Sequence, residues 1–185
     1  MERKVFYHKA GASFSAEEFA GQLKSFIDET LVVSGKEKVL FLCIGSDRST
    51  GDSLGPLVGH ALKKGSLGNV LGTLSSPVHA MNLDSTLEYI NDFFSDCIVI
   101  AIDASVGQPA HVGYITIGRG SIKPGLGVSK NLREVGDIFI TGIVGSGYGD
   151  EPFLLQSTRL KIVVELAESI CEGIDYARCM GRLCI

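Results

Sequence analysis

The sequence lacks the features that mark membrane-spanning, secreted and nucleic-acid-binding proteins. No run approaches the roughly 18 apolar residues of a membrane span, and no apolar segment follows the charged first residues as it would in a signal peptide. Lys and Arg number 17 against 21 Asp and Glu, so the basic surplus of a dedicated nucleic-acid binder is missing. We therefore expect a cytoplasmic protein that binds neither a membrane nor nucleic acid.

The cysteines also exclude two classes of small domain. There are five of them, an odd number with no CxxC pair, so neither a disulfide scaffold nor a zinc knuckle is expected. Cys43 and Cys97 lie within apolar runs and are predicted to be buried small hydrophobes. Reduced thiols agree with a cytoplasmic location.

The remaining composition is that of an ordinary folded domain. Of the 185 residues, 45% are hydrophobic and 21% are charged, which excludes intrinsic disorder and fits one domain over residues 1–185. Glycine is unusually frequent, with 23 residues. Without the strict period of collagen, this excess predicts loops in which the backbone closely approaches its neighbours.

Apolar runs alternate with segments of helical periodicity. Continuous apolar runs predict strands buried on both faces, and such strands alternating with helices predict a three-layer α/β/α sandwich with a mostly parallel central sheet, of the phosphorylase/hydrolase-like kind. The expected strands are Lys38–Gly45, Asn69–Leu74, Cys97–Ile102, Val112–Ile117 (at an edge or antiparallel) and Asp137–Val144, and the expected helices are Ser13–Leu31, Asp52–Lys64, Asn82–Phe94 and Gln156–Glu172.

Two carboxylates follow predicted strands. Ligands of parallel sheets bind beyond the carboxyl ends of the strands, where the loops after Gly45 and Ile102 should bring Asp52 and Asp103 together. Two nearby carboxylates cannot both ionise freely, so such a pair can act as acid and base. The same pair could instead hold a divalent metal ion.

The loop GSDRSTGDSLGP after the first of these strands resembles two known motifs incompletely. It is not a phosphate-binding loop, because Asp52 stands where that loop has lysine. The stretch GDSLG around Ser53 resembles both a nucleophile elbow and the GDSL esterase signature. However, a polar loop separates Ser53 from the strand, and no late DxxH follows. The alternative is that Ser53 completes a helix cap.

Several polar residues are further candidates for contact with a substrate. Asp47, Ser49 and Thr50 precede the first aspartate and are expected to line its cleft. His79 follows the second predicted strand and is expected to reach the edge of the site. Lys130, in a glycine-rich loop, could neutralise or orient the carboxylates.

Three blocks, in order, resemble the germination protease of spore-forming bacteria. They are CIGSDRSTGDSLGPLVG, IVIAIDASVG and KPGLGVSKNLREVG, within a resemblance that runs from Lys38 to Glu172. The wider superfamily includes the hydrogenase-maturation endopeptidases and has an α/β fold. The resemblance implies an endopeptidase of sporulation or germination whose catalytic aspartates are Asp52 and Asp103. It also implies protein or peptide substrates, such as small acid-soluble spore proteins.

The sequence differs from both protease families in ways that affect the expected chemistry. In the hydrogenase endopeptidases the matching acidic positions contact a metal together with a downstream histidine. No histidine lies near Lys130–Arg133, so we expect no resident cofactor, with a divalent metal held by Asp52 and Asp103 as the alternative. The germination protease is also longer than this chain and is made as a zymogen.

The main hypothesis is a peptidase in which one aspartate activates water and the other polarises the scissile carbonyl. Asp52, near a helix N-terminus, is expected to be charged and to act as the base. Asp103, at the end of a buried strand, is then expected to be the acid. The alternatives are a non-catalytic relative that binds a peptide or metal, and a serine hydrolase that uses Ser53. A second copy of the chain is a further candidate partner.

Overall fold

A six-stranded sheet runs through the centre of the computed structural model, which describes residues 4–124, 133–147 and 153–181. The strands lie in the order β1-β5-β6-β4-β2-β3, and the four from β6 to β3 are parallel. The expected mostly parallel sheet is therefore confirmed. The strands are β1 (Val5–Lys9), β2 (Lys38–Cys43), β3 (Val70–Leu71), β4 (Cys97–Gly107), β5 (Tyr114–Arg119) and β6 (Ile138–Ser146); the helices are α1 (Ala16–Ser34), α2 (Leu54–Lys64), α3 (Leu83–Phe93), α4 (Phe153–Gln156) and α5 (Leu160–Cys179).

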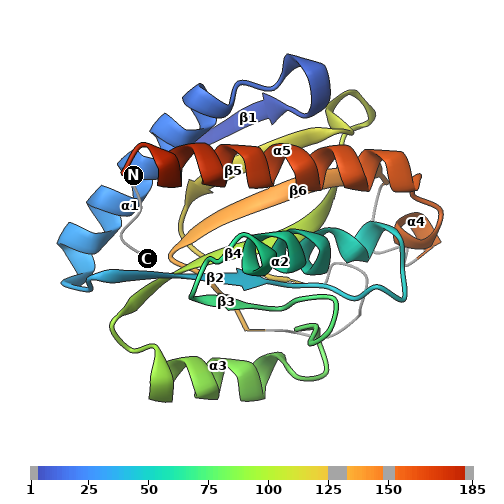
Figure 1. Cartoon of the computed structure of the whole chain (residues 1–185). Coiled ribbons are helices and arrows are strands. Elements are labelled where there is room, and N and C mark those ends of the chain that lie inside the picture. Colours follow the sequence, from blue (N-terminus) through green and yellow to red (C-terminus); the bar gives the residue numbers. More distant parts are fainter. Residues whose placement is uncertain (1–3, 125–132, 148–152, 182–185) are drawn as a thin grey trace.

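Helices cover the two faces of the sheet unequally (Figure 1). α1, α2 and α5 lie on one face, where Phe19, Val58 and Ile170 pack against β2, β4 and β6. Among the described residues, α3 is the helix on the other face, where Leu83 and Ile90 cover β2 and part of β4. Because β2 and β4 contact helices on both sides, their residues are apolar without alternation. This arrangement confirms the predicted α/β sandwich.

The first strand, β1, was not predicted. It pairs antiparallel with β5 at the edge of the sheet, so β5 is antiparallel as expected but is an internal strand. β1 contains a buried histidine, His8, whose Nε2 lies 2.7 Å from Oε1 of Gln22 and whose ring packs on Phe19. A histidine on the buried side breaks the apolar alternation that would have indicated a strand.

Two element boundaries near the expected site differ from the prediction. β4 does not end at Ile102 but continues to Gly107, because its pairing with β6 extends to Gly107. Asp103 therefore lies within the strand. The helix expected from Asp52 begins at Leu54, after a 3₁₀ turn over Gly51–Ser53.

Further local features can be read from the structure. Ser15 caps α1, because its hydroxyl accepts a hydrogen bond from the Glu18 amide at 3.2 Å. Cys43 and Cys97 are buried and form no disulfide, as expected. Among the described residues, no helix is long and apolar enough to cross a membrane.

Helix α2 packs directly on backbone, and this contact is testable. A Cβ at Gly59 would overlap the carbonyl oxygen of Gly72, whereas a Cβ at Gly21 of α1 would meet nothing. We expect Gly59→Ala to lower the free energy of unfolding by about 1–3 kcal/mol through overpacking. Gly21→Ala should instead raise it by about 0.5–1 kcal/mol, because alanine is the better helix former. Urea unfolding of both variants measures the contrast, and equal effects would contradict direct backbone packing.

Candidate active site

The site lies where β2 and β4 run side by side. Cys43 of β2 pairs in register with Ile102 of β4, so the loop that leaves β2 passes beside Asp103. In that loop the Ser46 amide donates a hydrogen bond to the carbonyl oxygen of Asp52 at 3.1 Å. The loop can fold back so closely because Gly45 has a φ of 139° and no Cβ, which would overlap that same oxygen. The sequence prediction that these loops meet is consistent with this geometry.

Asp52 is a half-buried carboxyl group in this fold-back loop. Burial raises its pKa above the ordinary value for an aspartate, although a backbone hydrogen bond from Ser46 and the nearby His79 oppose the rise. This rise is opposite in direction to the effect expected from a helix N-terminus. Asp52 sits inside the short 3₁₀ turn of Gly51–Ser53 rather than ahead of α2, and desolvation outweighs the helix dipole.

Asp103 is the more deeply buried carboxyl group, with 5% of its surface exposed. Its Oδ1 accepts a hydrogen bond from the Ala104 amide at 2.8 Å, and such a bond favours the carboxylate form. Across the sheet Asp103 pairs with Thr141 of β6, and Thr141 pairs with Thr116 of β5. The two threonine hydroxyls are 2.7 Å apart, so a row of polar side chains leads away from Asp103 on the face that carries α3.

His79 is held in a defined orientation by the turn that precedes α3. Its backbone amide donates to Oδ1 of Asn82 at 2.8 Å, and the Asn82 side chain donates to the carbonyl of Pro77. The ring Nδ1 accepts a hydrogen bond from the Met81 amide at 3.3 Å. With Nδ1 as the acceptor, a neutral His79 carries its proton on Nε2.

Asp52, His79 and Asp103 line one cavity of about 230 Å³. Three of the expected site residues are thus brought together. Ser46 and Arg48 also line this cavity and were missed from the sequence, although their place between a strand end and the first aspartate was a signal that could have included them. The remaining lining residues are Ile44, Gly45, Ala80, Met81, Leu83 and Pro124.

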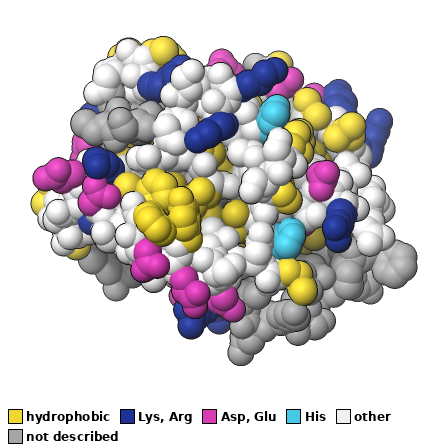
Figure 2. All heavy atoms as spheres, turned by 60° about the horizontal axis from the view of Figure 1, so that its bottom comes forward, with side chains coloured by type: hydrophobic (Ala, Val, Ile, Leu, Met, Phe, Trp, Pro, Cys, Tyr) yellow, Lys and Arg dark blue, Asp and Glu magenta, His cyan; other side chains and the backbone are white. Residues whose placement is uncertain are grey.

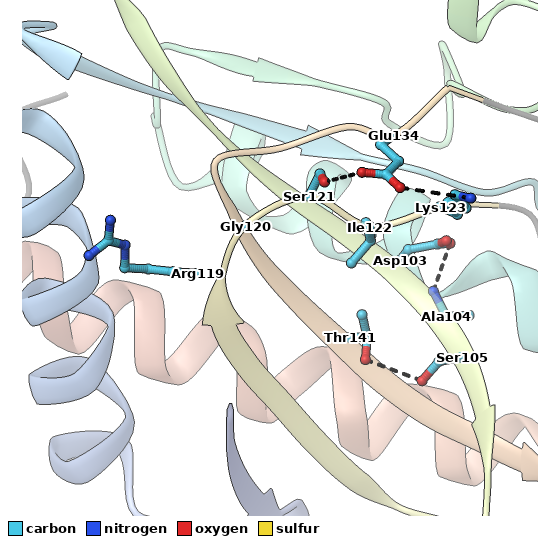
Figure 3. Close-up of a pocket in the computed structure, with 10 residues that line it drawn as sticks. All are labelled: Asp103, Ala104, Ser105, Arg119, Gly120, Ser121, Ile122, Lys123, Glu134 and Thr141. Atoms are coloured by element: carbon cyan, nitrogen blue, oxygen red, sulfur yellow. Dashed lines mark hydrogen bonds and ion pairs between the residues drawn. The ribbon is translucent and has the colours of Figure 1, made fainter. Parts of the chain in front are cut away.

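A second cavity, of about 560 Å³, opens on the other side of Asp103 (Figure 3). Its walls come from β4, β5 and β6 and from the segment after β5, and they include the hydroxyls of Ser105 and Thr141, which are 3.2 Å apart. At its rim Glu134 accepts a hydrogen bond from Ser121 and lies 3.8 Å from the Lys123 ammonium. Asp103 therefore lines two adjoining cavities.

The other expected site residues lie elsewhere. Asp47 is exposed, and neither it nor Ser49 or Thr50 is among the described residues that line either cavity. Ser53 is buried, and its hydroxyl donates to the carbonyl of Thr50 at 2.7 Å, which closes its own turn rather than capping α2. Lys130 lies outside the described residues.

The acidic pair does not by itself make a metal site. The described residues contain no group of three or more His, Cys, Asp or Glu side chains placed to hold a metal ion. Within the described part of the chain, a metal on Asp52 and Asp103 would therefore have no third His, Cys, Asp or Glu ligand.

The chain matches a protein family and a known relative over most of its length. The family model described as "Protein of unknown function (DUF1256)" matches residues 9–173. The chain is also similar to "Uncharacterized protein YyaC" of Bacillus subtilis (strain 168). The identity is 45% over 158 residues, which cover 84% of this chain and 77% of that protein. The matched range of the family model includes Asp52, His79 and Asp103.

The raised pKa of Asp52 predicts a dependence of stability on pH. Because the folded form holds this proton more tightly than the unfolded form, stability falls as pH rises from the unfolded pKa through the folded pKa. Asp52→Asn removes this loss, so the variant should have a higher Tm than the parent at neutral pH. The two should converge in acid below the ordinary pKa of an aspartate.

The matched control is Asp47→Asn, an exposed carboxylate of the same loop, which should leave the Tm nearly unchanged. Thermal unfolding, followed by circular dichroism at neutral pH and in acid, measures the difference in Tm between each variant and the parent. A lower Tm for Asp52→Asn at neutral pH would show that the Asp52 carboxylate stabilises the fold instead.

Proposed function

This chain belongs to the DUF1256 family, and we propose that it is an endopeptidase in which Asp52 and Asp103 activate water and polarise the scissile carbonyl. One observation carries the proposal: both carboxyl groups line the same small cavity in unlike surroundings. Burial raises the pKa of Asp52, whereas Asp103 accepts a backbone N–H bond. Two carboxyl groups that share a cavity in unlike surroundings can divide the roles of acid and base.

We propose the two roles in the reverse of the order expected from sequence. Asp52, whose burial favours the neutral form, holds the proton and acts as the acid. Asp103, whose Oδ1 accepts the Ala104 amide, is the carboxylate and acts as the base. The proposal differs from the assignment based on the helix dipole because desolvation is the largest influence on the pKa of Asp52.

The proposed reaction is general acid–base hydrolysis. The Asp103 carboxylate takes a proton from water while the water oxygen attacks the peptide carbonyl carbon. Asp52 donates a hydrogen bond to the carbonyl oxygen as it becomes negative. The C–N bond then breaks, the leaving nitrogen takes up a proton from the pair, and a carboxylic acid and an amine result. No group changes oxidation state, and water is the only co-reactant.

His79 has a place in this scheme as a hydrogen-bond donor. The Met81 amide bond to Nδ1 leaves the Nε2 proton of the neutral ring for another acceptor. His79 shares the cavity with both aspartates, so Nε2–H is proposed to stabilise the negative oxygen of the tetrahedral intermediate.

The resemblance to the germination protease supports a peptide substrate. It rests on the segments TGDSLGP and AIDA, which contain Asp52 and Asp103. We extend it to the proposal that the substrates are proteins such as small acid-soluble spore proteins, cleaved in the cytoplasm of the spore or sporulating cell.

The geometry favours the aspartate pair over a Ser53 nucleophile. The Ser53 hydroxyl is buried and donates to the Thr50 carbonyl, so it would have to leave that bond to attack a substrate. The non-catalytic alternative, a relative that binds a peptide or metal without cleaving, is separated from the proposal by the cleavage experiment.

The proposal predicts loss of cleavage on neutralising either aspartate. Asp52→Asn and Asp103→Asn should each reduce the rate of cleavage of small acid-soluble spore proteins by about 10²–10⁴-fold, the usual contribution of a positioned acid or base. Mass spectrometry of the products gives the rate and the cleaved bond.

Asp47→Asn is the control, because Asp47 is an exposed acid of the same loop that lines neither cavity; it should retain the parental rate. Circular dichroism establishes that all three variants are folded. Full activity of both site variants would refute the mechanism, and substrate binding without any cleavage by the parent would establish the non-catalytic alternative.

The assignment of Asp52 as the acid predicts the direction of the pH dependence. The rate should fall as pH rises through the raised pKa of Asp52, because the proton it must donate is lost. The residual rate of Asp52→Asn should lack this descending limb. A limb that persists in Asp52→Asn but disappears in Asp103→Asn would reverse the two roles.

A further inference from the structure

Helix α3 presents an aromatic pair to solvent. Tyr89 and Phe93 are 46% and 68% exposed, and their ring centroids lie 4.7 Å apart. The opposite side of the helix is anchored by Leu83 and Ile90, which are buried against the sheet. Figure 2 views the molecule from this side and shows an apolar patch bordered by acidic side chains. The aromatic pair is thus exposed and does not belong to the hydrophobic core.

Acidic side chains line the same helix beside the aromatic pair. Asp84, Glu88 and Asp92 recur at intervals of four residues and are all exposed, and α3 contains no Lys, Arg or His. Like charges at this spacing destabilise a helix by about 0.2–0.5 kcal/mol per pair. Asp92 adds a negative charge to the last turn, where the helix dipole is also negative. Glu88 and Asp92 therefore weaken α3, whereas Asp84 lies in its first turn and is paired with Arg133.

Two other long helices contain oppositely charged residues at this spacing. α1 places Lys24 four residues before Asp28, and α5 places Lys161 four residues before Glu165; both pairs are ion-paired. Within the described part of the chain, Glu88 and Asp92 take part in no ion pair. Exposed acidic residues four apart also occur on α5, as Glu168 and Glu172. Among the described helices, α3 differs in that its acidic residues lie beside an exposed aromatic pair.

From these features we propose that the outer face of α3 is a docking surface for a basic segment of another protein. An apolar side chain of that segment would pack on the rings of Tyr89 and Phe93, and flanking Lys or Arg side chains would pair with Glu88 and Asp92. Both rings could also take a cation on their faces. Charge complementarity selects this occupant. A bound Lys or Arg would offset the repulsion between Glu88 and Asp92 and the unfavourable interaction of Asp92 with the helix dipole.

A second copy of the chain does not fit this surface as well. A symmetric dimer through α3 would bring two acidic stripes together, in a protein whose formal net charge is already −4. The proposal is independent of the endopeptidase, since neither Tyr89 nor Phe93 lines the active-site cavity.

The absence of tryptophan from the chain allows a direct test. Tyr89→Trp places a single fluorescent reporter on the surface and keeps an aromatic ring there. The probes are two synthetic helical peptides of equal length, one built from Lys and Leu and the other from Glu and Leu. We expect a saturable fluorescence change with the Lys/Leu peptide that weakens as salt is added, and none with the Glu/Leu peptide.

Second substitutions in the reporter background separate this surface from general attraction to an acidic protein. Phe93→Ser should weaken binding of the Lys/Leu peptide by about tenfold or more, as expected for loss of an interface anchor. Glu88→Lys with Asp92→Lys should abolish it. The matched control is Val33→Ser, at another exposed apolar residue, which should leave the affinity unchanged.

Four results would overturn the proposal. They are no binding of the Lys/Leu peptide, equal binding of the Glu/Leu peptide, an affinity that Phe93→Ser does not change, and self-association of the reporter chain that Phe93→Ser abolishes. Circular dichroism of each variant shows whether α3 is intact, so that a loss of binding reports on the surface rather than on unfolding.

Discussion

The site depends on a close contact between backbone segments at the end of β2. A Cβ at Gly45 would overlap the Asp52 carbonyl, one at Gly55 would overlap that of Ile44, and one at Gly59 would overlap that of Gly72. With no side chains between them, α2 and its preceding turn lie directly against the strand end. Asp52 is thereby held in a half-buried position, where desolvation raises its pKa. The glycine excess of the sequence thus contributes to the chemistry of a carboxyl group.

The unequal covering of the sheet explains how Asp103 is both buried and accessible. The face that carries α3 is covered by a helix over β2 and part of β4. Beyond this helix Asp103 stands in a row with Thr141 and Thr116, and polar side chains there line a cavity rather than a core. A carboxylate in the middle of a strand would be costly under a helix; at the margin of α3 it reaches the two cavities that it lines.

The sequence predicts the sheet well and the site in part. Continuous apolar runs identify β2 and β4, and the rule for parallel strand ends brings Asp52 and Asp103 to one place. The argument from the helix dipole did not include the burial of Asp52, because its depth depends on the packing of a short 3₁₀ turn that no local pattern reveals. Strand β1 was missed because its inward residue is His8, whose partners Gln22 and Phe19 come from a distant helix.

The place of β1 in the sheet has a consequence for the order of folding. β1 precedes the other strands of this sheet in the chain, yet its partner is β5, with Val5 opposite Gly118. β2, β3 and β4 can pair with one another before β5 exists. During synthesis β1 therefore has no strand to pair with while the parallel part of the sheet assembles. Closing so long a loop is entropically costly, so attachment of β1 is expected to be a late step, with its apolar side chains open to chaperones until then.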